Sequence, residues 1–84
     1  MILAIRVLRD GVAIREQIFT ATPIRIGRAP HNDLVLVDPT VSRDHARIER
    51  DQAGSLVIVD GAGPNGLYAG PKRVEAEPVS GRFR

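Results

Sequence analysis

Residues 24–48 of the chain read IRIGRAPHNDLVLVDPTVSRDHARI, and this stretch decides the fold. Its apolar runs are short, and they are separated by loops rich in Pro, Asn and Asp, with almost no helical periodicity. Such runs are typical of β-strands bounded by turns. They cover Ile24 to Gly27 and Leu34 to Val37, and a third predicted strand, Ala46 to Arg50, alternates between inward and outward residues. Loops on a β scaffold are also where binding residues tend to collect.

The same pattern continues on both sides of this stretch. Asp10-Gly11 is a strong two-residue hairpin signal between two apolar segments. The remaining predicted strands are Ile2 to Leu8, Val12 to Phe19, Ser55 to Asp60, Leu67 to Ala69 and Lys72 to Glu75. Many short strands with frequent turns predict an all-β chain, folded as an antiparallel β-sandwich or a small barrel.

Length and composition limit the alternatives. The 84 residues form one domain, and a hydrophobic share of 43% is enough for a single core. The chain has no cysteine, which excludes disulfides and thiolate metal sites. We expect no metal and no cofactor. The first charge, Arg6, ends the N-terminal apolar run too early for a signal peptide, and no later run is long enough to cross a membrane. We expect a cytoplasmic protein without a membrane partner.

The charge balance gives little support to nucleic-acid binding. Twelve basic and ten acidic residues leave a net charge of only +2. The basic residues are spread along the chain, and no stacking aromatic residues lie between them. A nucleic-acid-binding surface normally shows a concentrated basic stripe. We therefore expect no nucleic-acid partner.

Four residues in the predicted loops fit the binding of a phosphate group. A phosphate dianion needs several converging donors, and the planar fork of an arginine can meet two of its oxygens at once. Arg28 and Arg43 offer such forks, and Ser42 adds a hydroxyl. Asn65 carries a carboxamide that can pair with the backbone of an extended peptide.

These motifs resemble those of the forkhead-associated (FHA) domain. The resemblance rests on residues 26–36, on Val41-Ser42-Arg43-Asp44-His45-Ala46, and on Asp60 followed by Asn65-Gly66. It implies a sandwich of up to eleven short strands over residues 1–84, whose loops at one end bind phosphothreonine peptides. Arg28 and Ser42 would bind the phosphate with help from Arg43, and Asn65 would hold the peptide main chain. Gly27, His45 and Gly66 would support the loops. The partner would be a phosphothreonine-containing protein, such as the substrate of a Ser/Thr kinase.

The chain departs from the family pattern at two places. The family often has hydroxyl residues before and after its Asn-Gly pair, where this chain has Gly63-Pro64 and Leu67. The segment Arg82-Phe83-Arg84 reads as the start of a strand, so we expect the C-terminal strand to be missing or incomplete. The resulting open edge would allow self-association.

Two other functions compete with phosphopeptide binding. Ser42, His45 and either Asp38 or Asp60 are the residue types of a hydrolase triad. However, Ser42 and His45 are close together on one segment, and no nucleophile elbow is present, so we expect no catalytic residues and no enzyme. The second alternative is an assembly module of the same fold, which binds its partner without phosphate through an open sheet edge.

Overall fold

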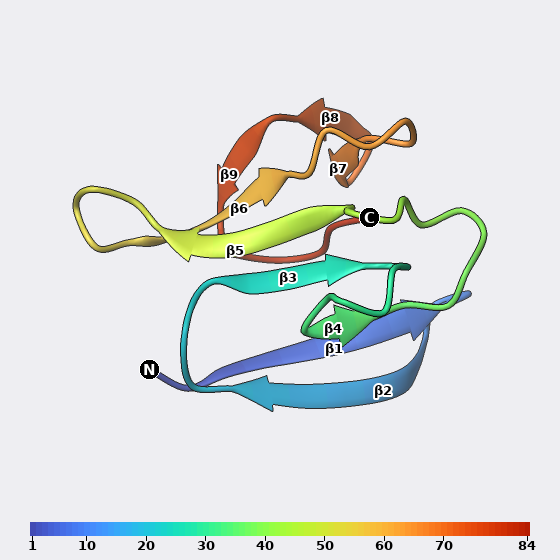
Figure 1. Ribbon diagram of the computed structural model, residues 1–84, viewed down its shortest axis with the longest axis horizontal. Helices are drawn as coiled ribbons and strands as arrows, with labels where there is room; N and C mark the ends of the chain where they lie inside the picture. The colour runs from blue at the N-terminus through green and yellow to red at the C-terminus, as the bar shows by residue number, and fades with distance from the viewer.

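The computed structural model describes residues 1–84 as an all-β sandwich without a helix. A five-stranded sheet, in the order β4-β3-β5-β6-β9, forms one layer, and the hairpins β1–β2 and β7–β8 pack against it. Figure 1 shows these two hairpins on opposite sides of the view. The strands are β1 (Leu3–Arg9), β2 (Val12–Phe19), β3 (Ile24–Gly27), β4 (Leu34–Val35), β5 (Ala46–Arg50), β6 (Leu56–Asp60), β7 (Leu67–Ala69), β8 (Lys72–Val74) and β9 (Ala76–Pro78).

The core is built almost entirely from aliphatic side chains. Alternate residues of the central strands point inward, since successive side chains of a strand face opposite sides of the sheet. Ile24, Ile48 and Ile58 are aligned across β3, β5 and β6, and all three are buried. Leu67 and Val74, which face each other across β7–β8, close the core from the other layer. No helix that could span a membrane is present.

The Asp10-Gly11 hairpin forms as predicted. Both residues have positive φ, 51° for Asp10 and 78° for Gly11, as a type I′ turn requires. Arg9 and Val12 pair directly across it. Farther from the turn, a β-bulge shifts the register between Val7 and Leu8, and Leu3, Ile5 and Val7 pack against the core cluster.

The predicted sandwich is confirmed, but some details differ from the sequence-based prediction. The pairing of β3 with β4 is parallel, and β4 ends at Val35 rather than Val37. Strand β9 was not predicted. It tolerates Pro78 because it lies at an edge of the sheet, where the backbone on one side of the strand has no partner strand to donate to. At the C-terminus, Phe83 bridges to Ala69, as expected for the beginning of a strand.

Candidate functional site

Three loops meet at one end of the sandwich, at the right of Figure 1. They connect β3 to β4, β4 to β5 and β6 to β7. Backbone hydrogen bonds join them: the Arg28 N–H donates to the Ser42 carbonyl (3.0 Å), and the Ala29 N–H donates to the Arg43 carbonyl (3.1 Å). On the other side, the Gly61 N–H donates to the His45 carbonyl (3.0 Å). The segment from Ser42 to His45 is therefore held between the other two loops.

Glycines allow this close packing. A Cβ atom at Gly27 would collide with the Arg43 carbonyl oxygen, and one at Gly61 would collide with the Asp44 carbonyl oxygen. A Cβ at Gly63 would overlap the Ser42 side chain. Gly27 was predicted from the sequence as a loop-shaping residue. Gly61 and Gly63 were not, although a loop so rich in glycine is a signal of close backbone approach.

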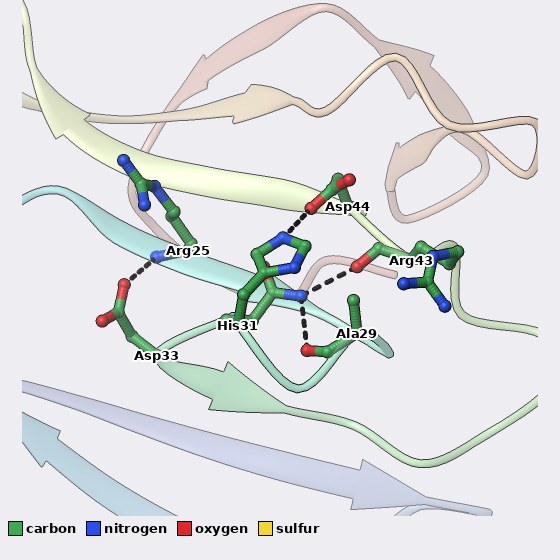
Figure 2. Close-up of polar contacts among 7 residues, drawn as sticks. Arg25, Ala29, His31, Asp33, Arg43 and Asp44 are labelled. Carbon is green, nitrogen blue, oxygen red and sulfur yellow. Dashed lines mark hydrogen bonds and ion pairs between the residues drawn. The ribbon is translucent and has the colours of Figure 1, made fainter.

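Two side chains add contacts between the first two loops. The buried Asn32 donates through Nδ2 to the Ala29 carbonyl of its own turn (2.9 Å) and to the Arg43 carbonyl across the gap (2.8 Å). His31 Nε2 lies 2.5 Å from the Asp44 carboxylate, at the surface. Figure 2 shows His31 and Asp44 facing each other above these loops. The contact of Asn32 with the second loop was not predicted from the sequence.

The loops surround an open hollow of about 460 Å³. Arg28, Ser42, Arg43 and Asn65, the four residues predicted from sequence to contact a ligand, all line it. The residues Pro39 and Val41 add an apolar wall. Side chains from three separate loops therefore converge on one space, as a polyatomic anion requires.

Arg28 and Ser42 are oriented by contacts with the protein itself. Arg28 Nε donates to the Val41 carbonyl (3.2 Å), which leaves both terminal nitrogens of its guanidinium without a partner. Ser42 is only 3% exposed, and its Oγ accepts from the Asn65 backbone N–H (3.3 Å). Because that oxygen already accepts a hydrogen bond, the hydroxyl proton is free to donate to a ligand. Arg43 is exposed and has no side-chain partner.

Asn65 also connects two loops. Its Nδ2 donates to the Thr40 carbonyl (2.7 Å), so one of its two amide N–H groups is used within the chain. The side-chain oxygen remains available and can accept a hydrogen bond from the N–H of a bound peptide. The second amide hydrogen also remains free to donate, so Asn65 keeps both the donor and the acceptor of the pairing that the sequence predicts.

His45 and Gly66 lie beside the ligand-lining residues. His45 Nδ1 accepts from the Ser42 backbone N–H (3.2 Å), a geometry that requires the ring proton on Nε2. Gly66 is buried and has a positive φ of 74°, which favours glycine. The guanidinium of Arg73 lies directly over it. Neither residue is among those that line the hollow.

The departures from the family pattern have structural counterparts. Leu67, which replaces a hydroxyl residue, is 1% exposed and belongs to the core. Gly63 is pressed against Ser42, where a larger side chain would not fit. Neither position supplies a hydroxyl group to the hollow. Ser42 is therefore the one residue with a hydroxyl group among those that line it.

Asp38 fixes the loop that carries Thr40 and Ser42. Its carboxylate accepts from the Thr40 hydroxyl (2.6 Å) and backbone N–H (2.8 Å), and Arg9 at the end of β1 forms an ion pair with it (3.2 Å). The hydrogen bonds from Thr40, assisted by Arg9, lower the pKa of Asp38 below its ordinary value. The contacts thus favour the charged form.

The lowered pKa of Asp38 predicts that its contribution to the stability of the fold depends on pH. A carboxyl group with a depressed folded-state pKa stabilises the fold above its unfolded pKa of about 3.9, and the contribution is lost as the pH falls through the folded value. Asp38→Asn should therefore lower the melting temperature at neutral pH. The difference in melting temperature between the variant and wild type should become smaller below about pH 4. Thermal melts of both proteins, from neutral pH to below about pH 4, measure this difference. Asp10→Asn, at a turn without such contacts, is the control; a gap independent of pH would contradict the assignment.

Comparisons with known proteins place this geometry in a family. The sequence model of the FHA domain matches residues 24–80. The oxoglutarate dehydrogenase inhibitor of Corynebacterium diphtheriae is 40% identical over 65 residues, which cover 69% of this chain and 45% of that protein. The chain thus spans less than half the length of this curated relative.

Solved structures share the fold as well. Mycobacterium tuberculosis EmbR, in complex with a low-affinity phosphopeptide, is 36% identical with a TM-score of 0.68, covering 79% of this chain and 17% of EmbR. A domain from an analysis of phosphothreonine-dependent FHA domain interactions is 25% identical with a TM-score of 0.71, covering 84% of this chain and 72% of that one. Because the family model matches well over half of its residues, in the region that builds the three loops, this chain belongs to the FHA domain family.

Proposed function

We propose that this chain binds a phosphothreonine-containing segment of a partner protein, in the hollow between the three loops. The observation that carries the proposal is the convergence of Arg28, Ser42 and Arg43 on one space, with a buried serine hydroxyl free to donate. Two similar proteins support it: EmbR, solved with a phosphopeptide, and the domain from the phosphothreonine-dependent interaction study. The function is that of a signalling interaction module rather than an enzyme.

The roles of the residues follow from their contacts. The free terminal nitrogens of Arg28 bind two phosphate oxygens, Ser42 donates to a third, and Arg43 adds charge from the rim. Each hydrogen bond to a charged group contributes about 1.5–3 kcal/mol. Three of them contribute about 4.5–9 kcal/mol, a range that includes the roughly 8 kcal/mol of binding free energy of a micromolar complex. The Asn65 side-chain oxygen holds the backbone of the extended ligand.

The hollow should prefer phosphothreonine to phosphoserine. The threonine methyl group would lie against Pro39 and Val41, and burial of one methyl group discriminates by about 1–3 kcal/mol. Calorimetric titration with matched phosphothreonine, phosphoserine and unphosphorylated peptides from a degenerate library tests both points. We expect binding in the micromolar range that requires the phosphate and is at least about fivefold weaker for phosphoserine. Equal affinities for the first two peptides would refute the methyl contact, and binding of the unphosphorylated peptide would refute the function.

A second candidate function rests on an unpaired strand edge. Strand β1 pairs only with β2, so its other edge has free backbone donors and acceptors. Ile2, Ile14 and Ile18, at the surface around this hairpin, are each more than half exposed. A partner strand could add to this edge without phosphate. In the same titration, an edge binder would be indifferent to dephosphorylation and to Arg28→Ala.

A further inference from the structure

Most arginines of the chain are engaged with acceptors, but five have guanidinium groups without a hydrogen bond or an ion pair. Arg6, Arg9 and Arg47, for example, pair with carboxylates. The unpaired arginines are Arg25, Arg43, Arg73, Arg82 and Arg84. Arg43 lines the hollow already described. Arg73 and Arg84 lie at a second position, each directly opposite Tyr68 on one of the two segments that flank it.

These two arginines and Tyr68 form a row across three neighbouring segments. Tyr68 of β7 is directly opposite Arg73 of β8. On its other side, Tyr68 exchanges two backbone hydrogen bonds with Arg84, 2.6 Å and 2.8 Å long, so these two residues also form a directly opposed pair. The Arg84 guanidinium carbon lies 5.2 Å from the centroid of the Tyr68 ring, within the range of a cation–π contact.

The row lies on the outer surface of the sandwich. Directly opposed residues of a sheet project from the same face, and neighbours along a strand project from opposite faces. Leu67 and Val74, next to the row in sequence, are buried in the core. Arg73 and Arg84 are exposed accordingly. We call Arg73, Tyr68 and Arg84 the arginine–tyrosine row.

This row begins at the rim of the phosphate hollow. The Nε and Cζ atoms of Arg73 lie 2.7 Å and 2.9 Å from the point where a Cβ of Gly66 would stand, so the guanidinium covers that glycine. The preceding residue, Asn65, lines the hollow. An extended peptide whose backbone is held by Asn65 would therefore bring a neighbouring side chain over Arg73.

We propose that the arginine–tyrosine row binds a second anionic group of the same ligand, near the phosphothreonine in sequence. This inference rests on the proposed function. The anion is a carboxylate or a further phosphate, since both match the planar fork of a guanidinium. The Tyr68 ring holds the Arg84 guanidinium in place, which reduces the conformational entropy lost on binding. The preferred ligands are thus phosphothreonine segments with acidic flanks.

Short synthetic peptides test this proposal. The reference peptide has a central phosphothreonine with uncharged flanks; the test peptides carry Glu, or alternatively phosphoserine, on one flank or the other. We expect an acidic group on one flank to raise the affinity of the wild-type chain about fivefold. A comparison of the Glu and phosphoserine peptides identifies which anion the row prefers.

Variants test whether the arginine–tyrosine row causes the gain in affinity for peptides with an acidic flank. Arg73→Gln should abolish the gain and leave the affinity for the uncharged-flank peptide unchanged. Arg50→Gln makes the same charge change at the β5 end, where Arg50 contacts the Gly54 carbonyl, and should preserve the gain. If thermal melting shows that Arg73→Gln destabilises the domain, Arg84→Gln takes its place, because the Arg84 guanidinium lies over the Tyr68 ring and makes no hydrogen bond or ion pair.

The outcomes separate the two proposals. If the uncharged-flank peptide binds but acidic flanks bring no gain, the inference is overturned and the proposed function stands. A gain that persists in both Arg73→Gln and Arg84→Gln also overturns it. If no phosphothreonine peptide binds, with or without acidic flanks, the proposed function fails and the inference fails with it.

Discussion

Gly61→Ala should destabilise the domain more than any exposed substitution. The added Cβ would stand well inside the van der Waals contact distance from the Asp44 carbonyl oxygen, and the carbonyl carbon of His45 would be only 3.0 Å away. Backbone atoms cannot rotate away as a flexible side chain can, so the loop before β5 must move. Overpacking of this kind costs about 3 kcal/mol or more, which lowers the melting temperature of a domain this small by roughly 10 °C or more.

Gly54→Ala is the matched control. It adds the same methyl group at the β5–β6 turn, where no atom lies within 4 Å of the added Cβ. Its φ of 83° makes alanine unfavourable, but only by about 1 kcal/mol. Thermal melts of the two variants therefore separate the steric clash from backbone strain. Equal melting temperatures would mean that the Ser42–His45 segment is not packed against Gly61 as described.

The strands were predictable because their signals are local. Val12 to Phe19 and Ala46 to Arg50 were predicted with the bounds that the structure shows. The Asp10-Gly11 turn marks the start of the first strand, and apolar and charged residues alternate in the second. Strand β9 was missed because Ala76-Glu77-Pro78 is short and polar. It pairs with β6 through its tertiary position at the sheet edge, which no local propensity encodes.

The candidate site was predictable as a set of residues but not as a set of contacts. Arg28, Ser42, Arg43 and Asn65 could be selected because their chemistry suits a phosphate and a peptide. That Asn32 reaches the Arg43 carbonyl, or that Asn65 uses its amide nitrogen on Thr40, depends on residues far apart in sequence. Such contacts are fixed by how the loops pack on the sandwich, and no sequence spacing specifies them.

Arg28→Ala should reduce phosphothreonine-peptide affinity at least about tenfold without unfolding the domain. The side chain is exposed and makes one hydrogen bond to the protein, from Nε to the Val41 carbonyl. Its backbone N–H, which joins the first two loops by donating to Ser42, is unaffected by the substitution. Stability should therefore change little, while the ligand loses its two charge-assisted hydrogen bonds.

Arg28→Lys and Arg50→Ala make this experiment specific. Lysine keeps the charge but not the fork, so Arg28→Lys should bind more tightly than Arg28→Ala and more weakly than wild type. Arg50→Ala removes one positive charge from the opposite end of β5 and should bind like wild type, because exposed charges more than about 10 Å apart are largely screened at ordinary salt. Wild-type affinity in Arg28→Ala, measured by calorimetry, would remove Arg28 from the phosphate site. If Arg50→Ala lost as much peptide affinity as Arg28→Ala, the net charge of the domain would attract the ligand. The position of the Arg28 guanidinium, beside the buried Ser42 hydroxyl, would then not matter.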